Sequence, residues 1–294
     1  MEIELVWRIE RMKKILLILC TCFICTGILA AAETVPYGSL VNIDEEEDAY
    51  NKYISDNNLS QYDSRKLKSL KRVTFDDLDT MLLALENDRI CYMWAPGVMA
   101  RYIADRNKNL KVVSSPTLAA YYSMATRKDD KELYEQINTA LIDIRNDGTL
   151  NTLVQKYIIS GERNTVLPKA TAGKPKIVVG VTGNMPTFDY VDESGIPAGF
   201  NVALMTEVAR RTDSNVSFVN VGWGSKLVAL SSKRIDVLFC FENYANLIGP
   251  SIGGTLLITR PYYHDEQCIV YNTRSKKVSL FKKVFKSLMG YKLD

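Results

Sequence analysis

Apolar and polar positions in the second half of the chain follow a pattern that predicts a β-α-β-α-β unit. Its first element is Lys176–Val181, a short β-branched run that is typical of a buried strand. A helix opening at 199–201 follows, with apolar residues at helical spacing, and then a strand at 216–221, a helix at 226–231 and a strand at 235–240. Short connections between such elements indicate a parallel sheet covered by helices.

The first half of the chain shows the same alternation of strand-like and helix-like patterns. Strands are expected at 39–43, 70–74, 89–94, 110–114 and 120–126, and helices at 44–54, 75–86, 98–105, 130–146 and 149–158. The expected fold class is therefore α/β in both halves. In open α/β sheets ligands bind beyond the carboxyl ends of the strands. We therefore expect a binding cleft where the loops at 182–190, 222–225 and 241–245 gather.

The N-terminal segment 1–32 differs from the rest of the chain. Met12 and two lysines precede the apolar run 15–29, and three alanines ending at Ala32 follow, which predicts a signal peptide cleaved after Ala32. The protein is accordingly expected to be exported, to an extracellular, cell-surface or periplasmic location. A lipid on a cysteine of the leader, and an uncleaved leader that anchors the protein in the membrane, are the alternatives.

Composition excludes several classes of protein. The chain of 294 residues is 47% hydrophobic and 24% charged with a net charge of +3, which is ordinary globular composition and offers nothing for nucleic acid. Its single histidine, His264, has no companion at metal-ligand spacing, so no metal site and no cofactor are expected. Cys91, Cys240 and Cys268 remain after cleavage, an odd count that favours small buried residues. A Cys240–Cys268 pair is the alternative.

The C-terminal segment 276–294 contains a basic amphipathic pattern. Apolar residues between Lys276 and Tyr291 fall on one helical face, and lysines flank that face. Such a helix can lie on an anionic membrane surface, or it can dock on the protein with its lysines in solvent.

Three stretches of the second half carry a family resemblance. The sequences IVVGVTGNMPTFDYVDESGIPAGFNVAL, LSSKRIDVLF and LLITRPYY resemble the family 3 extracellular solute-binding proteins, the amino-acid-type receptors of ABC importers. In the first half, YSMATRKDDKELYEQINTALIDIRNDGTLNTLVQKYI resembles the closing portion of the same family. The resemblance covers about 37–275 and implies a two-lobed, type II periplasmic-binding-protein-like fold that closes on a small ligand by a hinge motion.

The resemblance implies a circularly permuted order of the family's blocks. Residues 37–115 resemble the family's second lobe, 118–159 its closing strand and helices, and 176–275 its first lobe, with a linker at 160–175. The closing segment 118–159 is expected to pack on the lobe 176–275. Permutation of this kind is tolerated because the ends of compact domains usually lie at the surface.

The resemblance also suggests ligand-binding positions in the second half. Met185 and Trp223 fall where the family places its two stacking platforms, and Phe188 lies in the same loop as Met185. Asn243 occupies the position of a ligand-binding hydroxyl, and Phe241 and Glu242 precede it.

Three departures from the family's pattern change the expected ligand. Ile248 stands where the family has the arginine that binds the amino acid's carboxylate, and Pro96 stands where it has the aspartate that binds the ammonium. The region Asp44–Glu45 stands where the family has a helix N-terminal threonine that also binds the carboxylate. The remaining residues are aromatic and acidic, with Tyr92 and Trp94 coming from the other lobe. This combination suits a polar, planar or cationic ligand, through cation–π contact.

The sequence therefore predicts a solute-binding protein that closes two lobes over a small polar or cationic ligand, with an ABC permease as partner. The alternative is a non-transport sensor, or a decayed binding module without affinity for amino acids. An enzyme is not expected, because no nucleophile–base pair stands out in the sequence.

Overall fold

The structure is a computed structural model that describes residues 35–40, 70–242, 256–279 and 282. The predicted leader, the predicted helix 44–54, Asn243, Ile248 and most of the C-terminal amphipathic pattern lie outside these residues. Within them, no helix has both the length and the hydrophobicity needed to cross a membrane.

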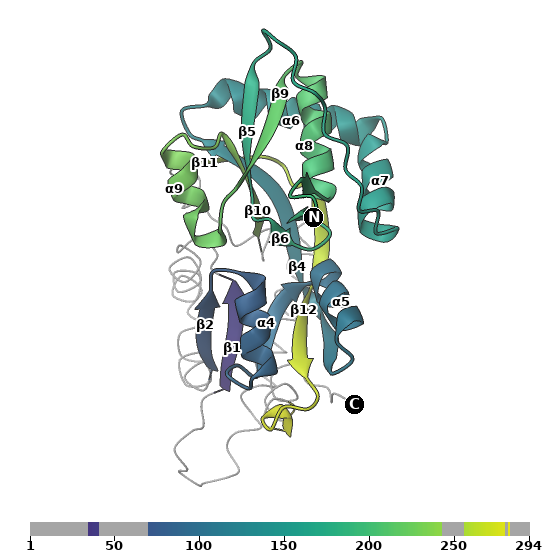
Figure 1. Cartoon of the computed structure of the whole chain (residues 1–294), viewed down its shortest axis with the longest axis vertical. Helices are drawn as coiled ribbons and strands as arrows, with labels where there is room; N and C mark the ends of the chain where they lie inside the picture. The colour runs from purple at the N-terminus through teal and green to yellow at the C-terminus, as the bar shows by residue number, and fades with distance from the viewer. Residues whose placement is uncertain (1–34, 41–69, 243–255, 280–281, 283–294) are drawn as a thin grey trace, which may run out of the picture.

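One mixed sheet of nine strands runs the length of the molecule (Figure 1), in the order β2-β1-β3-β12-β4-β10-β5-β9 with β11 paired to β4. The strands are β1 (Val35–Leu40), β2 (Leu70–Phe75), β3 (Tyr92–Pro96), β4 (Leu110–Arg127), β5 (Lys176–Val181), β9 (Asn215–Asn220), β10 (Val237–Glu242), β11 (Leu256–Ile258) and β12 (Tyr263–Asn272). The helices are α4 (Leu78–Glu86), α5 (Gly97–Arg106), α6 (Lys131–Asn146), α7 (Thr149–Leu153), α8 (Phe200–Arg211) and α9 (Lys226–Ser231). A π-helical segment, Val154–Ile159, continues α7.

The sheet divides into two lobes. In the lower lobe of Figure 1, β1 pairs in parallel with β2 and β3, and in the upper lobe β5 pairs in parallel with β9 and β10. The strands β4 and β12 are antiparallel to their neighbours and run from one lobe into the other. The predicted two-lobed α/β fold is confirmed, but the sheet is mixed because of these two crossing strands.

The strand β4 corrects the prediction of two separate strands at 110–114 and 120–126. Both segments pair with β12, from Leu110↔Asn272 to Tyr122↔Tyr263, so they form one strand. The gap between the two predicted segments is a bulge: between Ser114↔Cys268 and Ala119↔Glu266, four residues of β4, Pro116 among them, oppose one residue of β12. Proline cannot donate a ladder hydrogen bond, which explains why the irregularity falls here.

Side chains of the upper-lobe strands alternate between two apolar cores. Val179 and Val237 belong to the main core with α8, whereas Val178 and Leu238 pack in a second core with Ala229 and Leu230 of α9. Because alternate residues of a strand point to opposite faces, α8 and α9 cover opposite faces of the sheet (Figure 1).

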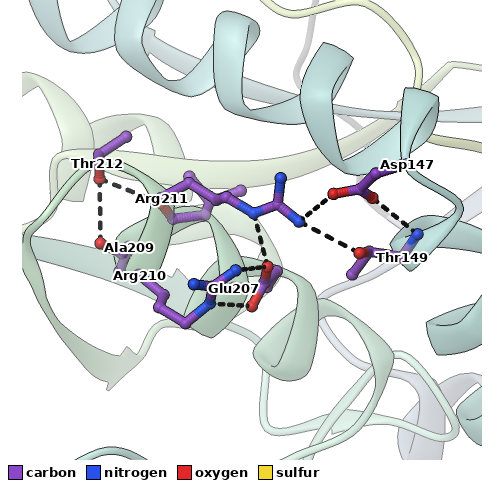
Figure 2. Close-up of polar contacts among 8 residues, drawn as sticks. Asp147, Thr149, Glu207, Ala209, Arg210, Arg211 and Thr212 are labelled. Atoms are coloured by element: carbon purple, nitrogen blue, oxygen red, sulfur yellow. Dashed lines mark hydrogen bonds and ion pairs between the residues drawn. The ribbon is translucent and has the colours of Figure 1, made fainter.

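The segment 131–159 lies against the upper lobe. Figure 2 shows Arg211 of α8 bound to Asp147 and Thr149 at the α6–α7 corner, with N–O distances of 2.5 and 3.2 Å, and to Glu207 at 2.7 Å. The predicted linker 160–175 is also tied to this lobe. Thr165 Oγ1 accepts from the N–H of Gly199, and Asn215 exchanges two hydrogen bonds with Thr171.

Between β5 and α8 the chain forms a small sheet that the sequence did not predict. Its strands are β6 (Asn184–Met185), β7 (Asp189–Val191) and β8 (Pro197–Ala198). Gly199 follows with φ of +109°, and a Cβ there would lie 2.5 Å from the carbonyl oxygen of Phe188. Only glycine fits such a position without strain.

Of the cysteines expected after cleavage, Cys91 and Cys268 are both buried, whereas only the backbone of Cys240 is described, within β10. Cys91 immediately precedes β3 and Cys268 lies within β12. Burial raises the pKa of the Cys268 thiol to about 11. Because Cys268 is a free thiol, the alternative of a Cys240–Cys268 disulfide is wrong.

Candidate functional site at the lobe boundary

The carboxyl ends of parallel strands from both lobes meet at the boundary between them. Strand β6, just after β5, contacts α4 of the other lobe. Gly224, after β9, faces Asp76, after β2: a Cβ on Gly224 would lie 3.1 Å from Asp76 Oδ1. Loops at such strand ends are where α/β sheets bind ligands, so this boundary is the candidate site.

The loop after β5 holds two of the predicted site residues, and both are buried. Phe188 is 0% exposed, with its ring stacked on Tyr122 at 4.4 Å between centroids and lying near Phe200 and Tyr263 at 6.3 and 5.9 Å. Met185 is buried at the end of β6. Phe188 is thus a core residue where the crossing strand β4 enters the upper lobe.

A buried carboxylate, Asp189, fixes the shape of this loop. Its Oδ1 accepts from the N–H of Thr182 at 2.7 Å and from the Thr182 hydroxyl. Its Oδ2 accepts from Asn201 Nδ2 at 2.8 Å, and Asn201 in turn accepts from the Tyr262 hydroxyl at 2.8 Å. Buried carboxylates persist where hydrogen bonds of this kind replace water. Local sequence pattern gave no sign of this network, because its members come from four separate segments of the chain.

Trp223 lies in the turn after β9, as predicted, but its ring is engaged by the protein itself. The ammonium of Lys226 lies 4.0 Å from the ring centroid and donates to the carbonyl of Phe239 at 3.1 Å. Both Trp223 and Lys226 are buried. The Trp223 ring was expected to bind a cationic ligand, but one of its faces already contacts the Lys226 ammonium. The sequence did carry a signal for this contact: a lysine stands three residues after the tryptophan, on the buried face of a short helix.

In the lower lobe, β3 brings Tyr92 and Trp94 together. Their rings meet edge to face, with centroids 6.5 Å apart and planes at 80°, as alternation along one strand face predicts. Tyr92 is buried and Trp94 is partly exposed. The side chains of Phe241 and Glu242 lie outside the description, although both backbones belong to β10.

A second group missed by the sequence analysis lies beside Pro96, at the start of α5. Asp265 of β12 accepts from the N–H of Val98 at 2.5 Å, and Arg101 contacts Asp265 at 3.5 Å and Glu266 at 2.5 Å. Burial raises the pKa of Asp265, against the hydrogen bond from Val98 and the charge of Arg101, which lower it. Asp265 lies 167 residues after Val98 along the chain, so local spacing carried no sign of this contact.

Comparison with known proteins finds sequence similarity to solute-binding proteins in the second half of the chain. Residues 177–289 match the model of the bacterial extracellular solute-binding proteins, family 3. A probable amino-acid ABC transporter-binding protein of Haemophilus influenzae is 31% identical over 118 residues, 40% of this chain and 42% of that protein. The L-cystine-binding protein TcyA of Bacillus subtilis is 36% identical over 66 residues, 22% of this chain and 25% of that protein.

A solved structure, the ligand-binding component of an ABC-type import system from Staphylococcus aureus with zinc bound, aligns over 87% of this chain and 71% of that one, with 13% identity and a TM-score of 0.45. In sequence, this chain matches less than half the length of the relatives from Haemophilus influenzae and Bacillus subtilis. The circularly permuted order of lobes stays a prediction.

Proposed function

We propose that this chain is an extracytoplasmic solute-binding protein that closes its two lobes over a small polar ligand and delivers it to an ABC permease. The observation that carries the proposal is the lobe boundary. Two lobes joined by the crossing strands β4 and β12 bring their strand ends face to face, as Gly224 and Asp76 show. Hinged closure on a ligand is a known use of this arrangement.

The family match and the relatives support the same function. The matched segment contains Trp223 and the turn that faces the other lobe. The names of the relatives point to amino acids and L-cystine as ligands of those proteins. Export, predicted from the leader pattern, is the localisation such a protein requires, and N-terminal sequencing of exported protein should begin at Glu33.

A non-transport sensor or a decayed binding module is the second candidate. The start of α5 favours it, because Pro96 replaces the acidic residue that the family resemblance implies, and the N–H of Val98 is already bound by Asp265. Neighbouring permease and ATPase genes would favour transport, whereas neighbouring kinase or cyclase genes would favour sensing.

Intrinsic fluorescence provides a direct test, because the mature chain carries one tryptophan in each lobe, Trp94 and Trp223. The purified mature protein is titrated with the twenty amino acids and a set of amines, and each hit is confirmed by calorimetry. A ligand closing the lobes should change the emission of both Trp94→Phe and Trp223→Phe single-tryptophan variants at the same midpoint. A protein that binds no member of the panel, and from which mass spectrometry recovers no co-purified solute, contradicts the proposal.

A further inference from the structure

Strand β9 forms one of the two edges of the large sheet. It stands at one end of the strand order and β2 at the other, so among the described strands each has a neighbour on one side only. The N–H groups of Asn215 and Val221, at the two ends of β9, donate toward the β5 side at 2.7 Å. Backbone groups alternate in direction along a strand, so those of Val216, Phe218 and Asn220 point away from β5. No strand in the described part of the chain pairs with these groups.

The two edges differ in the side chains that natural sheets use to prevent pairing with another chain. β2 has Lys71 and Arg72 in its sequence LKRVTF, and charged side chains on an edge oppose such pairing. β9, with the sequence NVSFVN, contains no charged residue and no proline. None of its six residues is fully buried, so the strand reaches the surface. Of the two edges, β9 is therefore the one that is open to a further strand.

The outward-pointing groups of β9 are arranged symmetrically about Phe218, which fits pairing with an identical strand. In an antiparallel pair of two β9 strands, Phe218 lies opposite its own counterpart, and Val216 lies opposite Asn220. Residues opposite each other in this way exchange both backbone hydrogen bonds, so all the outward N–H and carbonyl groups of both strands are paired. The register places no charge opposite a like charge and brings two phenylalanine rings together across the axis.

We propose that β9 pairs antiparallel with β9 of a second copy of this chain, which joins the two sheets into one across a dimer. The contact is isologous, so it closes after two copies. Antiparallel pairing directs the two β9 strands oppositely, and the Trp223–Ser225 turns that follow them lie at opposite ends of the contact. The dimer thus keeps the two lobe boundaries apart, and the inference does not depend on the proposed solute-binding function.

Opposite charges introduced at Ser217 test this pairing. In the proposed register the Ser217 side chains of the two copies are diagonal neighbours on one face, within reach of each other when replaced by long charged side chains. Sedimentation velocity measures the mass of the mature protein over a wide range of concentrations, for the wild type, Ser217→Lys, Ser217→Glu and an equimolar mixture of these two variants. Thr74→Lys, at an exposed position on the other edge strand β2, is the control. Thermal unfolding establishes that each variant is folded.

The wild-type protein should change from the mass of one chain to that of two as its concentration rises. Each Ser217 variant alone should keep the mass of one chain where the wild type is a dimer, because like charges then meet across the axis. The mixture should form dimers again, since lysine then faces glutamate. Thr74→Lys should dimerise as the wild type does.

Amide hydrogen exchange provides a second readout. The N–H groups of Val216, Phe218 and Asn220 should exchange more slowly in the wild-type dimer than in the Ser217→Lys monomer, while those of Val219 and Val221, which point toward β5, should be equally protected in both. A wild-type protein that is monomeric throughout, a dimer that Ser217→Lys does not weaken, or a mixture that stays monomeric overturns the inference. None of these outcomes bears on solute binding.

Discussion

The ring of Phe188 lies nearly flat on the ring of Tyr122, with centroids 4.4 Å apart and planes at 16°. Tyr122 belongs to the crossing strand β4, and Phe188 to the loop after β5. Stacked aromatic pairs contribute to stability beyond the area they bury. The contact therefore joins the segment that arrives from the other lobe to the loop that shapes the candidate site.

Replacing Phe188 with alanine should lower the free energy of unfolding by about 3–5 kcal/mol, because the ring is fully buried and its removal leaves a cavity. Urea unfolding followed by circular dichroism measures this change. Val191→Ala, at a partly exposed position at the end of the neighbouring strand β7, is the control and should change stability by less than about 1 kcal/mol. Equal effects of the two variants would show that Phe188 is not part of the core.

Gly97 should not tolerate a side chain while Glu266 is present. A Cβ on Gly97 would lie 2.7 Å from Glu266 Cγ and 3.0 Å from Arg101 Nη1. We expect Gly97→Ala to destabilise the protein by about 1–3 kcal/mol, as overpacking does. Because Glu266 supplies the closest atom, Glu266→Ala should restore part of this loss in the double variant. Strictly additive effects in the double-mutant cycle would contradict the crowding seen at the start of α5.

Arg127, at the end of β4, should depend on Asp236. Its guanidinium donates to Asp236 Oδ1 at 2.8 Å and to the carbonyl of Leu230 at 3.1 Å, and Asp236 Oδ2 accepts from the N–H of Val178 at 2.9 Å. Asp236→Ala should cost about 3 kcal/mol by leaving a largely buried cation and a strand N–H without this acceptor. Asp236→Asn, which can still accept from Val178, should cost less. The measurement is chemical unfolding of both variants side by side, and a larger loss in Asp236→Asn would refute the assignment.

The α6–α7 corner should loosen from α8 in acid. Hydrogen bonds from Thr149 and Arg211 lower the pKa of Asp147 to about 2, below its unfolded value near 3.8. A carboxyl group whose pKa is lower in the folded state stabilises the fold above its unfolded pKa, and the contribution is lost as pH falls through the folded pKa. Stability should therefore decrease between about pH 4 and pH 2.

Asp147→Asn should reduce the slope of stability against pH in this interval, and thermal unfolding at closely spaced pH values measures it. Asp129→Asn, an exposed residue before α6, is the control and should keep the wild-type slope. An unchanged slope in Asp147→Asn would mean that Arg211 does not hold the corner through this carboxylate.

Local pattern predicted the elements whose apolar spacing is regular and whose ends carry clear signals. α9 was predicted at its observed bounds, and β2 and α6 within one residue at each end. The small sheet β6-β7-β8 was missed because strands of two or three residues are too short to show alternation. β4 was predicted as two strands because only its pairing with β12 joins the two segments across the bulge, and such pairing is invisible to a local window.

Most of what the sequence missed at the candidate site depends on residues distant along the chain. Asp265 reaches the start of α5 only because β12 lies beside β3, and Phe188 is buried only because β4 brings Tyr122 against it. The Trp223–Lys226 pair is the exception, since both residues lie within one turn. The sequence shows that a tryptophan and a lysine lie close together, but it does not show that the lysine side chain turns toward the ring.

The paired crossing strands limit how the two lobes are able to move. β4 and β12 are bonded to each other on both sides of the bulge, so together they form a ribbon and not two separate tethers. A two-stranded ribbon resists bending within its own plane. It bends more easily out of that plane, about an axis that runs across both strands. That axis passes through the bulge opposite Gln267, where ladder pairing is interrupted. Rotation of the lobes about that axis would carry the turn Trp223–Ser225, where Gly224 faces Asp76, toward or away from the start of α4.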